Sequence, residues 1–166
     1  YNLLLYSQRR SLHRAIAEWY ENSFIQNIMT YYPVLAHHWK QADVPQKAIE
    51  YLEKSGEMAF RNGTYREAIQ FFSQAVEKAG NGTDANIPPM KQAYWLRRMG
   101  EAQMGLGDMD SAQQHFRTAA LILKHPSPTN TSGVIMGLVS QWFVQNLHRR
   151  FPNFFILFNK IIAPPA

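Results

Sequence analysis

The stretches GEMAFRNGTYREAIQFFSQA, residues 56–75, and GEAQMGLGDMDSAQQHFRTA, residues 100–119, repeat one spacing of small and aromatic residues. A small residue lets two helices approach closely, a glycine turns the chain, and Ala and Phe interlock on the second helix. The spacing therefore predicts two helical hairpins, which stack into binding surfaces and seldom carry chemistry. The matched positions, each displaced by 44 residues, are Gly56, Gly63, Tyr65, Ala68, Phe72 and Ala75 in the first stretch and Gly100, Gly107, Met109, Ala112, Phe116 and Ala119 in the second.

Apolar residues recur with a period of about 3.6 along most of the chain, and alternation with a period of two is nearly missing. We therefore expect an all-α fold, a solenoid of helical hairpins with flanking helices. In the first helix, Leu12, Ile16, Trp19 and Tyr20 fall on one face at helical spacing. The expected helices cover residues 7–22, 33–42, 45–60, 64–78, 89–104, 108–124 and 134–150.

Local start signals support these boundaries. Pro33 and Pro45 suit the first turn of a helix, where the missing N–H is not needed. Thr64 and Glu67 have the spacing of a capping box, and Asp108 is placed to cap the helix that follows it. The helices therefore have starts that the sequence itself marks.

The bulk composition is that of an ordinary globular protein, with 46% hydrophobic and 17% charged residues. The formal net charge of +5 is mild, and the basic residues are too scattered to form a phosphate-binding stripe. Cysteine is absent, which excludes a disulfide framework, thiolate zinc sites and cysteine nucleophiles, and suits a reducing compartment. We therefore expect an intracellular, cytoplasmic location.

The two hairpins resemble tetratricopeptide repeats. Gly56 and Gly100 stand where that repeat has its small residue, and Phe72 and Phe116 match the aromatic residue of its second helix. The repeat spans 34 residues, and the loop at residues 80–89, rich in Gly, Asn and Pro, accounts for the longer period here. The resemblance implies degenerate repeats, because Ala59 and Gln103 replace the usual Tyr, and Leu52 and Leu96 the usual Trp.

A wider resemblance covers residues 1 to about 78. The run LLLYSQRRSLHRAIAEWYE at residues 3–21, with LAHHWKQA at 35–42 and KAIEYL at 47–52, is similar to one region of large signalling proteins. In those proteins this region is where an ATPase module meets helical repeats, and they often also carry class III adenylate or guanylate cyclase domains. LHRR at residues 147–150 fits a basic segment that follows the repeats. The resemblance implies a regulatory module of a larger nucleotide-dependent protein. The catalytic residues of the proteins in that family lie outside this stretch.

The chain carries no motif of catalysis or cofactor binding. It has neither a GxxxxGK[ST] phosphate loop nor a GxSxG nucleophile. His37 and His38 are adjacent, so on a helix they point about 100° apart and cannot chelate one ion together. The arginines around Tyr94 fit a packed helix with solvated cations better than a nucleic-acid surface. We expect no enzyme activity, cofactor, metal site or nucleic-acid partner in this stretch.

Three parts are expected along the chain: a junction helix at residues 1–29, the repeat array at 30–125 and apolar helices at 126–166. The apolar runs at 134–144 and 154–162 are too short to span a bilayer, which needs about 20 apolar residues. We expect them to cap the open end of the array or to dock on other parts of a protein. Contact of residues 134–162 with a membrane surface is the alternative.

The predicted function is protein–protein interaction or regulatory scaffolding within a larger signalling protein. Reversing the charges of Arg97 and Arg98 is expected to weaken partner capture without unfolding the chain. Two alternatives stay open: a small structural subunit of a large assembly, membrane-associated or not, and an enzyme assembled from scattered helices. The candidate partner-binding residues, on the concave face that first helices of such repeats line, are Glu53, Glu57, Arg61, Tyr94, Arg97, Arg98 and Glu101.

Overall fold

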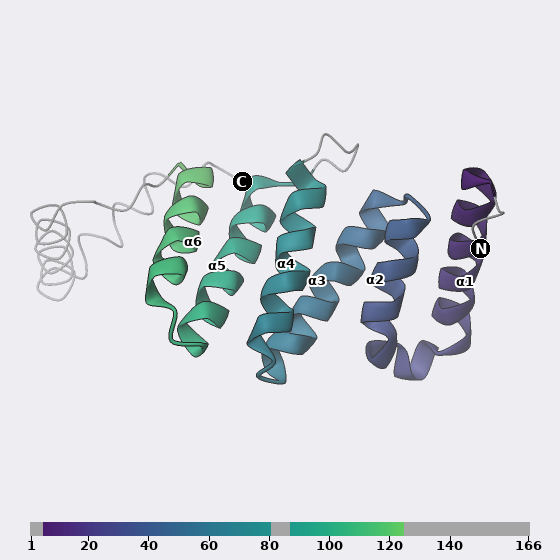
Figure 1. The fold of residues 1–166 in the computed structure, drawn as a ribbon, viewed down its shortest axis with the longest axis horizontal. Coiled ribbons are helices and arrows are strands. Elements are labelled where there is room, and N and C mark those ends of the chain that lie inside the picture. The colour runs from purple at the N-terminus through teal and green to yellow at the C-terminus, as the bar shows by residue number, and fades with distance from the viewer. Residues whose placement is uncertain (1–4, 81–86, 125–166) are drawn as a thin grey trace, which may run out of the picture. The chain divides into compact units, whose positions relative to one another are not determined.

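The structure is a computed structural model that describes residues 5–80 and 87–124. Those residues contain helices and no β-strand, so the predicted all-α class is confirmed for them. The chain divides into two units, Tyr1–Pro126 and Ser127–Ala166, and every described residue belongs to the first. The predicted helix at 134–150 and the whole segment 126–166 lie outside the described residues. The elements in Figure 1 are α1 (Tyr6–Ser23), η1 (Ile25–Tyr31), α2 (Tyr32–Gln41), α3 (Pro45–Arg61), α4 (Tyr65–Gly80), α5 (Pro89–Gly105) and α6 (Met109–Ile122).

The six α-helices of the described residues follow one another in chain order, and sequence neighbours pack side by side and antiparallel (Figure 1). Each begins and ends within two residues of its predicted bounds. Proline lies in the first turn of α2, α3 and α5, as the sequence predicted for the first two. The side chain of Asp108 accepts a hydrogen bond from the Ser111 amide at 3.1 Å, which confirms the predicted cap of α6.

The start of α4 is tied to the end of α3 by Thr64. Its hydroxyl donates to the carbonyl oxygen of Ala59 at 3.1 Å, and its amide donates to the same oxygen at 3.0 Å. The capping box of Thr64 with Glu67 stays a prediction.

A short 3₁₀ helix, η1, joins α1 to α2 and has no counterpart among the predicted elements. The ring of Tyr31, at its end, lies 4.4 Å from that of Phe24 and 5.2 Å from that of Tyr20, centroid to centroid. These aromatic contacts, with the end of α1 and with Phe24, hold the segment in place. A pattern search misses it because 3₁₀ turns are short and their geometry is poorly encoded in local spacing.

The buried face of α1 differs from the predicted one. His13 and Ala17 are buried, whereas Leu12 and Trp19 are 45% and 56% exposed. Ile16 and Tyr20 are half-buried at the edge of this face. The buried stripe is thus rotated by about one residue, roughly 100° around the helix, because α1 packs through a histidine that a hydropathy pattern treats as polar.

Both hairpins close at the small residue of the repeated motif, where the sequence predicted a close approach of two helices, and the group that the small residue meets is the phenylalanine ring. A Cβ atom added at Gly56 would lie 2.8 Å from the ring of Phe72, and one added at Gly100 would lie 2.7 Å from that of Phe116. The absent side chain therefore lets the paired helices approach. The turns use Gly63 at φ +75° and Gly107 at φ +82°, in the left-handed region that favours glycine.

Helix α5 joins the two hairpins because it packs on both sides. Trp95 and Met99 belong to the same buried cluster as Phe72 of α4. Ala93 and Leu96 form a second, smaller cluster with Ala119 of α6. The main core therefore runs from α1 to α5, and α6 is held by the smaller cluster.

Candidate functional site

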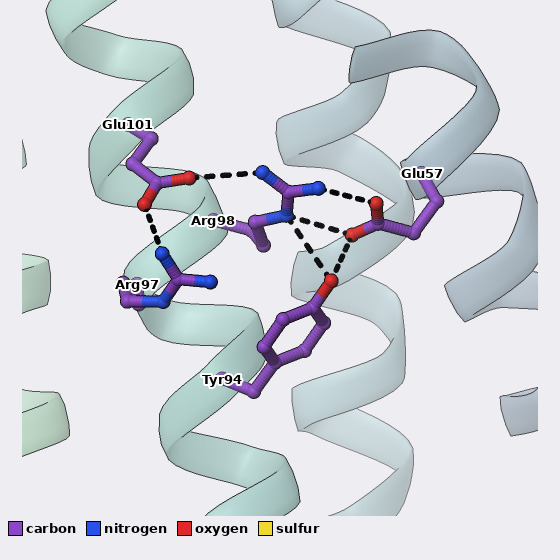
Figure 2. Close-up of polar contacts among 5 residues, drawn as sticks. All are labelled: Glu57, Tyr94, Arg97, Arg98 and Glu101. Carbon is purple, nitrogen blue, oxygen red and sulfur yellow. Dashed lines mark hydrogen bonds and ion pairs between the residues drawn. The ribbon is translucent and has the colours of Figure 1, made fainter. Parts of the chain in front are cut away.

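A polar network links α5 to α3 at the predicted surface (Figure 2). The carboxylate of Glu57, on α3, accepts hydrogen bonds from Tyr94 Oη at 2.6 Å and from Arg98 Nε at 2.8 Å. Arg98 Nη2 also donates to the second oxygen of Glu57, which makes the ion pair bidentate. These two charged side chains are 17% and 18% exposed, so the pair is largely shielded from water.

The network continues along α5 through Glu101. Its carboxylate accepts from Arg98 Nη1 at 3.0 Å and from Arg97 Nη1, as Figure 2 shows. The guanidinium of Arg98 also stacks over the ring of Phe60, with 4.3 Å from Cζ to the ring centroid. Each of the three guanidinium nitrogens of Arg98 therefore donates a hydrogen bond, and the ring of Phe60 lies against the guanidinium.

The shared charges shift the titration of these groups. Burial by itself raises the pKa of Glu57, but hydrogen bonds from Arg98 and Tyr94 outweigh burial and hold that pKa below its ordinary value. Hydrogen bonding to Glu57 raises the pKa of Arg98 further. Burial is the largest cause that raises the pKa of Tyr94, and the hydrogen bond to Glu57 raises it further. At neutral pH Glu57 is therefore an anion, Arg98 a cation and Tyr94 a neutral phenol.

A groove of about 600 Å³ runs over α3 beside this network. Its apolar part comes from Met29 of η1, Tyr32 of α2 and Met58 of α3. The other lining residues are charged or polar: Glu50, Glu53, Lys54, Glu57, Arg61, Asn62 and Lys91.

Most charges in this groove are already paired within the chain. Lys91 of α5 bonds Glu53 of α3 at 2.7 Å, and Lys54 bonds Glu50 one turn away at 2.6 Å. Arg61, at the end of α3, is exposed and makes no ion pair within the described part of the chain. The groove therefore offers apolar side chains, charges that are paired within the chain, and Arg61, a cation without an ion pair in the described residues.

A second groove, of about 380 Å³, lies between α5 and α6 and is almost wholly apolar. Phe116 and Ala119 line it from α6, and Met90 and Ala93 from α5. Tyr94 and Arg97 also line it, and Tyr94 reaches across to Glu57 in the wall of the first groove. The remaining lining residues are Ala120 and Leu123.

The structure thus divides the seven predicted contact residues. Glu53, Glu57 and Arg61 line the groove over α3, whereas Tyr94 and Arg97 line the apolar groove. Arg98 and Glu101 complete the network that joins α3 to α5. Arg98 forms an ion pair with Glu57, so reversing the charge of Arg98 also breaks the contact between α5 and α3. Arg61 is therefore the better position at which to test binding.

Sequence reasoning missed seven of the ten residues that line the groove over α3. Glu50 and Lys54 carry a signal that could have found them, because they share a helix face with Glu53 and Glu57 at spacings of three and four. Met29 and Tyr32 carry no such signal, since they reach the groove through the turn of η1.

In residues 5–80 and 87–124 no group of three or more His, Cys, Asp or Glu side chains has an arrangement that could hold a metal ion. Within the same residues, no helix combines the length and apolar character needed to cross a bilayer. Comparison of the chain with protein-family models, with curated proteins and with solved structures gives no match. The grooves and the residues that line them are therefore the features from which a function can be inferred.

Proposed function

We propose that this chain is a protein-interaction module, a solenoid of degenerate tetratricopeptide-type hairpins that binds a segment of a protein partner in the groove over α3. One observation carries the proposal. The groove of about 600 Å³ lies on the first helix of a hairpin and is lined by three of the residues predicted for partner contact, Glu53, Glu57 and Arg61. First helices line the concave face in repeats of this type, where partners bind.

The composition of the groove favours a partner segment with apolar side chains. Met29, Tyr32 and Met58 offer apolar area, and methionine adapts its shape to different ligands. The internal pairing of Glu53 with Lys91 and of Glu57 with Arg98 removes the large single-sign field that would select a highly charged ligand. Arg61 is the position at which charge would orient the segment.

The resemblance of residues 3–21 and 35–52 extends the proposal to the parent protein. We infer a regulatory or scaffolding role within a larger nucleotide-dependent signalling protein, an ATPase or nucleotide cyclase, in an intracellular location. The catalytic residues of such a protein would lie outside this stretch. The intact mass of the native polypeptide tests this part, because a mass close to the 19.2 kDa of this chain would exclude such a parent.

Site-specific photo-crosslinking tests the binding groove. A benzophenone amino acid is placed at Arg61, in the groove, or at Gln113, an exposed position on α6 that lines neither groove. We expect adducts of one discrete partner from position 61 and none from position 113. Adducts of equal yield at both positions would contradict the groove as the binding site.

A charge reversal then tests whether the groove sets the affinity. Arg61→Glu is expected to weaken binding of the cross-linked partner about tenfold, a loss typical of a well-placed interface residue. Arg117→Glu, an exposed arginine on α6, is the matched control and leaves binding unchanged. Equal binding by both variants would remove Arg61 from the interface.

The second candidate function is a small structural subunit of a large assembly. The apolar groove between α5 and α6 favours it, because a nearly wholly apolar surface is typical of permanent contacts. Native mass spectrometry of the endogenous protein distinguishes the two candidates. A single stable complex of fixed composition supports the subunit, and a chain that exchanges between free and bound forms supports the interaction module.

A further inference from the structure

Three histidines meet where α1 packs on α2, although His13 is far from His37 and His38 in the sequence. Nδ1 of His13 lies 2.8 Å from Nδ1 of His38, and their ring centroids are 5.0 Å apart. The ring of His37 is 5.8 Å from that of His13 and 5.3 Å from that of His38. His13 is only 7% exposed, so this contact forms part of the α1–α2 interface.

The contact between the two Nδ1 atoms depends on protonation. A hydrogen bond at this distance needs one N–H and one lone pair, which a neutral pair or a singly protonated pair supplies. When both rings are protonated, two N–H groups and two positive charges face each other. The doubly protonated pair is therefore incompatible with the docked geometry.

Other charged and titratable groups of the packed elements surround the pair without supplying excess negative charge. On α1, Arg14 pairs with Glu18 at 3.3 Å. Arg10 pairs at 3.2 Å with Asp43, which follows α2. On α1 the other such groups include Arg9, half-buried one turn before His13, and Tyr20, whose ring stacks on that of His38 at 6.3 Å. On the packed elements they include His37 and Lys40 of α2, Tyr31 of η1, and Lys47 and Tyr51 of α3, which contact Glu21 at the far end of α1.

The environment disfavours the charged imidazoles. Burial lowers the pKa of His13, and the charge of His37 lowers it further. Burial also lowers the pKa of His38, with added contributions from His13 and His37. The two histidines thus bind fewer protons when α1 is docked on α2 than when α1 is released. Docking is therefore fully stable above about pH 6.5, the ordinary pKa of histidine, and weakens as the pH falls below that value.

The C-terminal end of α1 is held by a contact that acid does not break in this range. One oxygen of Glu21 accepts from Tyr51 Oη at 2.6 Å, Lys47 Nζ at 3.0 Å and Trp39 Nε1 at 3.2 Å. Burial would raise the pKa of Glu21, but these hydrogen bonds lower it overall, so the carboxylate stays ionised near pH 5.5. Glu21 lies about 12 Å along the helix from His13, at 1.5 Å per residue.

We propose that His13 and His38 form an acid-sensitive latch, which docks the N-terminal half of α1 on α2 and releases it when both rings are protonated. The half of α1 beyond Ala17 stays docked through Glu21. Acidification therefore opens residues 6–14 as an arm and leaves the rest of the array folded. Neither His13 nor His38 lines the groove over α3.

Hydrogen exchange on the full 166-residue chain tests the latch, with rates corrected for the intrinsic effect of pH. Between pH 7.5 and 5.5, protection of residues 7–14 is expected to fall about tenfold, the factor for one histidine of ordinary pKa 6.5 that must bind a proton on release. Protection of residues 18–23 stays constant. In His38→Gln, the Gln amide accepts from His13 whether or not that ring is charged, so the acid-induced loss is expected to be clearly smaller than in wild type, although burial of His13 and the charge of His37 remain.

His115→Gln is the matched control, because His115 is also half-buried with a pKa lowered by burial but lies on α6. It should leave the acid response of residues 7–14 intact. An equal response in wild type and His38→Gln, or an equal loss in both halves of α1, overturns the latch. If His38→Gln fails to dock α1 at pH 7.5, NMR titration of the wild-type imidazoles decides instead. If His13 and His38 titrate as a coupled pair whose second protonation occurs well below pH 6.5, the latch is supported. If each of the two imidazoles titrates independently near pH 6.5, the latch is overturned.

Discussion

The two hairpins contain the same glycine–phenylalanine contact but place it in different surroundings. Phe72, on α4, has no exposed surface, because α5 covers the first hairpin with Trp95 and Met99. Phe116, on α6, is half-buried and lines an apolar groove that no described element covers. The motif therefore sets the contact within a hairpin, and the place of the hairpin in the chain sets how deeply that contact is buried.

The contrast should appear most strongly when the aromatic ring is removed. Phe72→Ala is expected to destabilise the protein by about 4 kcal/mol, because it removes a fully buried ring and leaves a cavity. Phe116→Ala is expected to cost about 2 kcal/mol, since half of that ring already faces solvent. Urea unfolding followed by circular dichroism measures both. Equal losses would mean that residues outside 5–80 and 87–124 cover Phe116 in the folded protein.

The link between the hairpins gives the next largest effect. Glu57→Gln should cost about 2 kcal/mol, because it leaves the guanidinium of Arg98 without its bidentate partner in a site 18% exposed. Glu101→Gln is the control, since Glu101 bonds arginines of its own helix, and it should cost less than half as much. A loss in Glu101→Gln as large as that in Glu57→Gln would show that the contact between α3 and α5 adds nothing.

The same link predicts a dependence on pH. The folded protein holds the pKa of Glu57 below the ordinary value of 4.5, so it binds fewer protons there than the unfolded chain. Its contribution is complete above about pH 4.5 and is lost as the pH falls further. The stability difference between wild type and Glu57→Gln should therefore shrink from pH 6 to pH 3. A constant difference would remove the carboxylate charge as its cause.

Local signals explain how much of this fold could be predicted. Pro45 marks the start of α3, Asp108 caps α6, and Gly63 and Gly107 adopt the positive φ angles that a turn requires. Each of these depends on residues within a few positions of one another. The helices and the closing contacts of both hairpins are therefore readable from spacing alone.

Long-range pairs explain what could not be predicted. His13 is buried on α1 because it meets His38, 25 positions away, and hydropathy alone assigned Leu12 and Trp19 to that face. Glu57 and Arg98, 41 positions apart, were both expected on the binding face, yet the structure pairs them with each other. From a single sequence one can predict which residues lie on a surface, but not which charged residues on that surface form ion pairs with one another.

The two glycines allow a finer comparison of the hairpins. Alanine at Gly56 gains about 1 kcal/mol of helix propensity, but its Cβ presses on a ring with no room to move, so a net loss of about 1–2 kcal/mol is expected. Alanine at Gly100 meets Phe116, which can shift into the open groove, so the net change should be close to zero. Thermal unfolding of the two variants measures this. A larger loss for Gly100→Ala would show that Phe116 is as firmly held as Phe72.

The smallest expected difference lies at the starts of the second helices. Asp108→Ala removes the acceptor for the Ser111 amide and a negative charge at the N-terminus of α6, so it should lower the melting temperature by a few degrees. Thr64→Ala should lower it less, because the carbonyl of Ala59 keeps its hydrogen bond from the Thr64 amide when the hydroxyl is lost. Asp108→Asn, which keeps an acceptor oxygen, should recover most of the loss. A drop for Thr64→Ala equal to that for Asp108→Ala would mean that the predicted capping box with Glu67 forms at the start of α4.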